Sequence, residues 1–183
     1  IIKPSFALEI KGNFKQGSLV IGKTNPTFEV YVQGKKVKIN QKGFFVFGVS
    51  RDQVKDVIIE IRDKSNIQTI IKKVKKRKFK IQRIDGLPKR KVTPNEEDMK
   101  RIRKEGKLIS KAKRVNSDLS YFFEDFIRPV NGITTGVFGS QRILNGKPRR
   151  PHFGIDIAAP KGTKVVNSNS GKVLLAEKNL FFT

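Results

Sequence analysis

The feature that most constrains the fold of this chain is a series of short apolar runs between residues 6 and 84. The runs are rich in β-branched and aromatic side chains, and Gly, Pro or Asn stands between them. They cover residues 6–10, 18–21, 27–32, 37–39, 44–47, 57–62 and 67–71. Runs of this kind are typical of antiparallel strands, and no helical period crosses the region. The pattern predicts a mainly β protein that begins with a small antiparallel β-sandwich over residues 1–84.

One helix is predicted after this region, inside a linker over residues 85–125. Thr93, Pro94 and Glu96 form the pattern of a capping box, with Thr93 as the N-cap. An apolar stripe with cations on the other faces follows at Met99, Ile102, Ile109, Ala112 and Val115. We expect a single helix from about residue 94 to residue 116 that links two domains. Short strands and turns resume from residue 126 to about residue 176.

The composition excludes several kinds of site. The chain has no cysteine and one histidine, so disulfides, thiolate zinc sites, cysteine nucleophiles and any site needing two of its own histidines are ruled out. No apolar run approaches 18–20 residues, so no transmembrane segment is expected. The chain begins with Ile1 rather than Met and ends on an apolar stretch, from which we expect truncation at both ends.

The chain is strongly basic, with 40 Lys and Arg against 16 Asp and Glu and a net charge of +24. Residues 72–91 hold eleven of these cations and one acid, Asp85. Clustered cations of this kind bind nucleic acids or other anionic polymers. A solvated edge strand, on which lysines prevent edge-to-edge pairing, explains them as well and is the interpretation we favour. No recognised DNA- or RNA-binding module occurs, so nucleic acid is not an expected partner.

His152 stands four residues before Asp156, and both residue types bind zinc. The donor atoms of two zinc ligands lie roughly 3–3.5 Å apart, given metal–ligand distances near 2 Å. A straight strand would instead separate the two Cα atoms by about 13 Å. Chelation therefore requires a bend between them, and Gly154 is the residue that would permit it. A lone His-x-x-x-Asp is a weak signal by itself.

The surrounding residues make the signal more specific. They follow the pattern Phe-Gly, Arg, Asn-Gly, His-x-Gly-x-Asp-Ile-Ala-Ala-Pro-x-Gly-Thr-x-Val and Gly-x-Val, and they resemble the lysostaphin-type (LytM-domain) zinc endopeptidases. The matching positions are Phe138, Gly139, Arg142, Asn145, Gly146, His152, Gly154, Asp156, Ala158, Pro160, Gly162, Thr163, Val165, Gly171 and Val173. The β-rich region before them, with residues 82–88, also looks like the N-terminal domain of some periplasmic members. The resemblance implies that residues 126–183 are an incomplete all-β metallopeptidase domain.

Carried over residue by residue, the resemblance makes His152 and Asp156 ligands of a Zn²⁺ ion, two of the three protein ligands that such enzymes use. The third ligand comes from a His-x-His motif, and that motif and a further histidine assist the attacking water. None of these is present, so no catalytic residue can be assigned within this chain. We expect an N-terminal fragment truncated before the His-x-His motif, inactive alone and with a poorly stable second domain.

Arg142 and Asn145 are candidates for lining the substrate groove. Asn145-Gly146 is also a strong tight-turn pair, and we favour the turn for Asn145. For Arg142 the two interpretations weigh equally.

The predicted function is hydrolysis of peptide bonds in peptidoglycan by a zinc metalloendopeptidase of the periplasm or cell envelope, with envelope or divisome proteins as further partners. The alternative is a non-catalytic LytM-like adaptor or activator of wall hydrolases. A basic nucleic-acid-binding module, resting on residues 72–91 alone, is the remote alternative.

Overall fold

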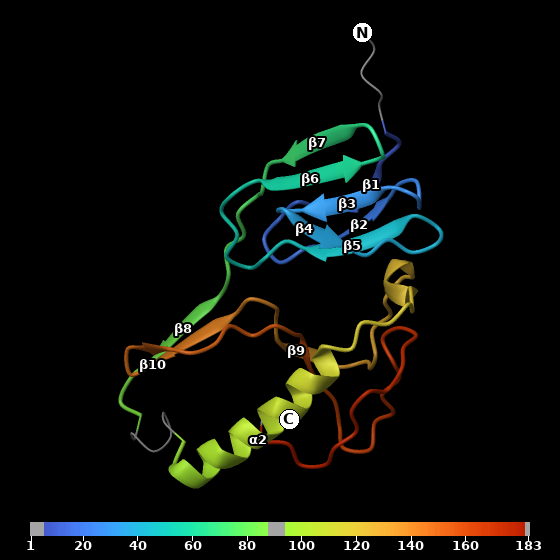
Figure 1. The fold of residues 1–183 in the computed structure, drawn as a ribbon. Helices are drawn as coiled ribbons and strands as arrows, with labels where there is room; N and C mark the ends of the chain where they lie inside the picture. The colour runs from blue at the N-terminus through green and yellow to red at the C-terminus, as the bar shows by residue number, and fades with distance from the viewer. Residues whose placement is uncertain (1–5, 88–93, 182–183) are drawn as a thin grey trace. The chain divides into compact units, whose positions relative to one another are not determined.

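The computed structural model describes residues 6–87 and 94–181, and the chain forms two compact units. The first unit comprises residues 1–79 and 122–125, and the second comprises residues 80–121 and 126–183. The fold is mainly β with mostly antiparallel sheets and one α-helix in the described ranges, as the sequence predicts (Figure 1). None of the helices formed by these residues is both long and apolar enough to span a membrane.

Two antiparallel sheets make up the first unit. One has the order β1-β2-β5 and the other the order β4-β3-β6-β7 (Figure 1). The strands are β1 Glu9–Gly12, β2 Leu19–Lys23, β3 Glu29–Val32, β4 Lys35–Val37, β5 Phe44–Gly48, β6 Val57–Arg62 and β7 Ile67–Lys72. Each of the seven apolar runs therefore overlaps or adjoins a strand, and the small antiparallel sandwich predicted from them is confirmed.

The core of the first unit lies between these two sheets. Val20 and Phe45 enter it from one sheet, and Val30, Ile59 and Ile61 enter it from the other; all five are fully buried. Burying an aliphatic or aromatic side chain of this size contributes about 1.5–3 kcal/mol. The alternation of buried and exposed residues along β6 shows that one face of that strand packs inward, as expected for a sandwich.

A tight turn at Gln33 and Gly34 joins β3 to β4. Both residues have positive φ angles, 51° and 72°. Tight turns with two positive φ angles match the twist of the strands they join, which explains why glycine stands at the second position.

The second unit contains the helix, α2 Glu96–Lys113. The predicted range of 94–116 was too long at both ends. Asn95 is the N-cap, and its side chain accepts a hydrogen bond of 2.7 Å from the amide of Asp98. Asn ranks above Thr as an N-cap, so the helix begins after Asn95. The predicted cap, Thr93, lies outside the described residues.

The predicted apolar stripe of α2 is its less exposed face. Met99, Ile102, Ile109 and Ala112 are half-buried, whereas Val115 lies beyond the helix end and is 54% exposed. No residue of α2 is fully buried. Three acidic residues lie in its first turn and two lysines in its last, an arrangement that favours the helix dipole.

Two small sheets complete the second unit. Strands β8 Ile81–Ile84, β10 Gln141–Leu144 and β11 Lys147–Pro148 form one sheet, in which β8 runs parallel to β10. Strands β9 Ile133–Gly136 and β12 Asp156–Ala158 form the other. Residues 159–181 form no strand, contrary to the expectation of further short strands there, because no partner strand pairs with them.

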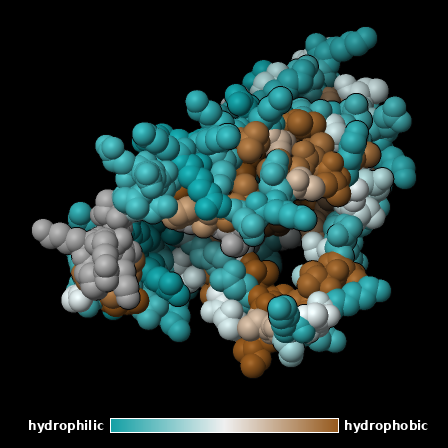
Figure 2. All heavy atoms as spheres, turned by 90° about the horizontal axis from the view of Figure 1, so that it is seen from below, coloured by the Kyte–Doolittle hydropathy of each residue, from teal (hydrophilic) through white to brown (hydrophobic). Residues whose placement is uncertain are grey.

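The two units differ in how much apolar surface they bury. All nine buried hydrophobic side chains of the described residues lie between Phe6 and Val74, in the first unit. The second unit instead exposes large apolar side chains such as Ile133, Val165 and Val173. Figure 2 shows hydrophobic side chains gathered in patches among hydrophilic ones on the molecular face it displays.

The predicted domain limits at residues 84 and 125 stay a prediction. Contacts group β8 and α2 with the second unit. The expectation of truncated ends also stays a prediction.

Candidate metal centre

Asp156 is placed by the pairing of β12 with β9. Its register partner is Gly136, and the register shifts between Asp156 and Ile157. A Cβ atom on Gly136 would lie only 2.3 Å from Oδ2 of Asp156. The carboxylate therefore occupies the space above the glycine Cα, where no other residue type leaves room for it.

His152 is placed by its backbone rather than by a strand. Its amide donates to the carbonyl of Ser140 at 2.8 Å, and its carbonyl accepts from the amide of Gly139 at 2.7 Å. Gly139 has a φ of 84°, a left-handed conformation that favours glycine. These two hydrogen bonds attach the segment before β12 to the turn before β10.

The two side chains meet as the zinc-ligand hypothesis requires. His152 Nε2 lies 3.3 Å from Oδ1 of Asp156, within the separation predicted for two donors around one metal ion. The chain bends at Gly154. Gly154 does not have a positive φ angle, and a Cβ there would make ordinary contact with the His152 ring at 3.6 Å, so the bend does not require glycine.

The Nε2 atom of His152 is buried and has no hydrogen-bond partner among the described residues. Its approach to Asp156 is close enough for an ion pair but does not have hydrogen-bond geometry. The His152 side chain as a whole is 34% exposed and that of Asp156 is 62% exposed, so solvent reaches both side chains but not the Nε2 atom itself. A buried imidazole nitrogen without a partner, beside a carboxylate oxygen, is an arrangement that a divalent cation would satisfy.

These two residues fit a zinc ion as part of a site rather than as a whole one. No cluster of three or more metal-binding side chains occurs in the ranges 6–87 and 94–181, and the sequence has no second histidine. Catalytic zinc sites use three protein ligands and leave one position open. The assignment of His152 and Asp156 as metal ligands stays a prediction that their geometry favours.

Asn145 and Gly146 form the expected tight turn between β10 and β11. Their φ angles are 48° and 72°. The Asn145 side chain also donates to the carbonyl of Leu87 at 2.7 Å and accepts from its amide at 3.0 Å. The side-chain amide of Asn145 therefore holds the segment after β8 against the turn. A contribution of Asn145 to a substrate groove stays a prediction.

Arg142 lies on β10, with an exposed side chain. Its carbonyl accepts from the amide of Arg149 at 2.8 Å, and it pairs in register with Gln82 of β8. The side chain is exposed, and its place in a substrate groove stays a prediction.

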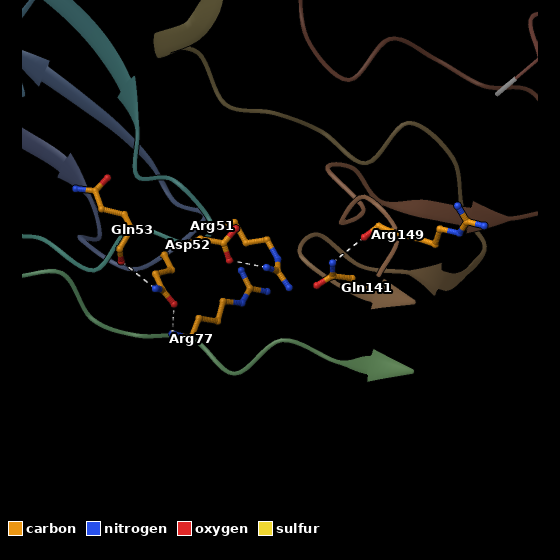
Figure 3. Close-up of polar contacts among 7 residues, drawn as sticks. Arg51, Asp52, Gln53, Arg77, Gln141 and Arg149 are labelled. Atoms are coloured by element: carbon orange, nitrogen blue, oxygen red, sulfur yellow. Dashed lines mark hydrogen bonds and ion pairs between the residues drawn. The ribbon is translucent and has the colours of Figure 1, made fainter. Parts of the chain in front are cut away.

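The sequence did not indicate the contribution of three residues that shape the site, namely Gly136, Gln141 and Phe153. Gly136 makes room for Asp156, as described above. Gln141 donates from Nε2 to the carbonyl of Arg149 at 2.7 Å, a contact drawn in Figure 3. The ring of Phe153 lies 5.9 Å from that of Phe138, centroid to centroid. The sequence carries a signal for Gly136: it ends the Ile-Thr-Thr-Gly run at a position where a strand usually has a β-branched residue, and a glycine there indicates a close approach of another group.

The fold and this site define a class: a mainly β chain that brings one histidine and one aspartate into metal-chelating distance. No model of a known protein family matches the sequence, and no curated protein matches it at a significant level. Among solved structures, it is similar to a Pseudomonas aeruginosa protein assigned to peptidase M23, with a TM-score of 0.57 and 23% sequence identity.

The likeness to that protein covers 88% of this chain and 62% of the other chain, so this chain spans less than two thirds of its length. At this identity the likeness shows a shared fold. The chain thus has the fold of a protein assigned to peptidase M23.

Proposed function

We propose that this chain is part of a zinc metalloendopeptidase that hydrolyses peptide bonds in peptidoglycan, in the periplasm or cell envelope. One observation carries the proposal: the unpartnered Nε2 of His152 lies 3.3 Å from Oδ1 of Asp156. The sequence pattern around this pair resembles the lysostaphin-type endopeptidases, and the fold is shared with a protein assigned to peptidase M23.

Each residue of the site has a defined task in this proposal. His152 would offer an imidazole nitrogen, and Asp156 would offer a carboxylate whose charge partly balances a divalent cation. A zinc ion held there would supply Lewis acidity for a peptide carbonyl and for the attacking water. Gly139 and Ser140 hold the histidine backbone by hydrogen bonds, and Gly136 leaves room for the carboxylate.

We propose that a His-x-His motif outside residues 1–183 supplies the third ligand and the assisting histidine. The single histidine of the chain supports this, as does the 62% coverage of the similar structure. Residues 1–183 alone are accordingly expected to bind zinc weakly and to leave the cell wall intact.

The test uses the native protein purified from its source, with the variants His152→Ala and Asp156→Ala. Digestion of purified sacculi is followed by mass spectrometry of the released peptides. We expect cleaved cross-links from the unaltered protein, at least a hundredfold less from either variant, and none after chelation of zinc. Lys164→Ala, an exposed change outside the pair, should retain activity. Full activity in His152→Ala would contradict the proposal.

A non-catalytic adaptor of wall hydrolases is the second candidate, because no group of three or more metal-binding side chains occurs among the described residues and the sequence has a single histidine. Such an adaptor would stimulate a separate wall hydrolase equally well with or without His152. The same variants, assayed with an added hydrolase, distinguish the two functions.

A further inference from the structure

The first unit has a hollow of about 460 Å³ whose charged lining residues are all lysines. Lys15 lines it beside residues 12–14, and Lys72, Lys73 and Lys75 line it from the end of β7 onward. Cations from two segments far apart in the sequence therefore converge on one depression.

Backbone hydrogen bonds fix these two segments side by side. The amide of Lys75 donates to the carbonyl of Phe14 at 2.7 Å, and the amide of Gln16 donates to the carbonyl of Lys75 at 3.0 Å. Lys15 and Lys75 form a parallel bridge. The Gln16 side chain extends this attachment through its contacts with Gln53 at 2.9 Å and Arg77 at 3.0 Å.

The lysine side chains are free to meet a ligand. Val74 is buried in the core, and its amide donates to Asp56 Oδ1 at 3.2 Å, which anchors the segment between Lys73 and Lys75. All four lysines are exposed, and none forms an ion pair with any residue of the described ranges. No carboxylate lines the hollow. The lysines repel one another, and a ligand with several negative charges would offset this repulsion.

The lining residues indicate recognition by charge rather than by stacking. Phe14, the single aromatic residue of the lining, is half-buried and packs near Phe47 with 6.3 Å between ring centroids. Proteins that bind single-stranded nucleic acids combine cations with aromatic faces on which bases stack. Lysine binds phosphate as a point charge, without the planar fork of arginine.

We propose that the hollow formed by Lys15, Lys72, Lys73 and Lys75 binds a flexible chain of phosphate groups that carries no bases. Several lysines would contact successive phosphates and release the counterions condensed on the chain. The site belongs to the first unit and does not depend on the metal centre or on the proposed peptidase activity.

The test measures binding of a short linear polyphosphate to the protein at several salt concentrations, by fluorescence competition and without zinc. In the variant Lys15→Gln/Lys72→Gln/Lys73→Gln/Lys75→Gln, we expect affinity to fall at least about tenfold at low salt, with a shallower salt dependence. The matched control, Lys35→Gln/Lys42→Gln/Lys55→Gln/Lys64→Gln, removes the same charge from exposed lysines of the same unit. Its affinity should change less than about threefold.

Two further binding measurements, with inorganic phosphate and with single-stranded DNA, identify the class of ligand. Monomeric inorganic phosphate should compete weakly, because it engages few of the lysines at once. Single-stranded DNA at equal phosphate concentration should bind more weakly than polyphosphate. An equal loss in both quadruple variants would overturn the proposal, because binding would then follow net charge alone. Tighter binding of DNA, or no binding of polyphosphate, would overturn it too. Circular dichroism confirms that both variants fold.

Discussion

At the scale of single residues, the His152–Asp156 pair depends on two independent attachments. The histidine is held by the turn at Gly139 and Ser140, whereas the aspartate is held by the pairing of β12 with β9. Neither attachment involves the two functional side chains themselves. A substitution can therefore disturb the pair without removing a donor atom, which gives a test of the geometry.

The substitution Gly136→Ala is such a test. Its Cβ would lie 2.3 Å from Oδ2 of Asp156, so the carboxylate has to move away from its place beside His152. We expect zinc affinity of the native protein to fall about tenfold or more, as for other changes that misplace a ligand. Calorimetric titration measures this. Gly171→Ala is the control, because a Cβ there meets nothing within 4 Å. Equal affinity in the two variants would show that the carboxylate does not need this space.

A second residue, Asp63, gives a pH dependence with a defined sign. The backbone amide of Ser65, followed by the amide and side chain of Asn66, holds the Asp63 pKa below its ordinary value of 3.8. A lowered folded-state pKa means that the stabilisation is complete above the ordinary value and is lost as pH falls through the folded one. Asp63→Ala should therefore lower the urea midpoint at neutral pH.

The difference between the unaltered protein and Asp63→Ala should narrow as the pH falls below about 4. Lys64→Ala changes the same exposed turn without removing the carboxylate, and its midpoint should follow that of the unaltered protein at every pH. A constant difference between Asp63→Ala and the unaltered protein across this range would contradict the assignment.

The chelating separation of His152 and Asp156 could be predicted, whereas the role of Gly136 could not. The first follows from metal–ligand distances alone, once both residues are taken as ligands. The second depends on the register of β9 against β12, which pairs residues twenty positions apart in the sequence and includes a shift at Asp156. No local pattern specifies that register.

At the scale of elements, local patterns identified the strands of the first unit because alternation and turn residues agree there. The turn at Gln33 and Gly34 shows this agreement directly. Strand β8 behaved differently: its partner is β10, about sixty residues later and parallel to it. Parallel partners are joined by long connections, so nothing near residues 81–84 indicates where they pair.

Helix α2 gives a prediction of its own at Gly106. This glycine lies within the helix, and a Cβ on it would meet nothing within 4 Å. Gly106→Ala should stabilise the helix by about 1 kcal/mol, because alanine loses less backbone entropy. The chemically identical change Gly34→Ala also enters open space, but φ there is +72°.

Gly34→Ala should therefore destabilise the first unit by about 1 kcal/mol, since a side chain is strained in that conformation. Circular dichroism at 222 nm during urea unfolding would report the helix, and near-ultraviolet signals would report the sandwich. A loss of helix stability in Gly106→Ala would refute the prediction.

At the scale of the whole molecule, the two units should differ in stability. The nine buried hydrophobic residues of the described chain all belong to the first unit, and burial of this kind is the main favourable term in folding. The second unit relies on short sheets and on α2, which has no fully buried residue. Unfolding should accordingly proceed in two steps, with the second unit losing structure first.

Native-state hydrogen exchange tests this order directly. Amides of β2, β5 and β6 should exchange slowest, and those of β9 and β12 should exchange by local opening at low urea. Ile59→Ala, which empties a fully buried position, should lower the stability of the first unit by about 2–5 kcal/mol and leave exchange in β9 unchanged. Ile133→Ala, at a position 76% exposed, should change neither unit by more than about 0.5 kcal/mol. Equal protection of β6 and β12 would mean that the second unit has a source of stability besides the buried apolar contacts found in the first.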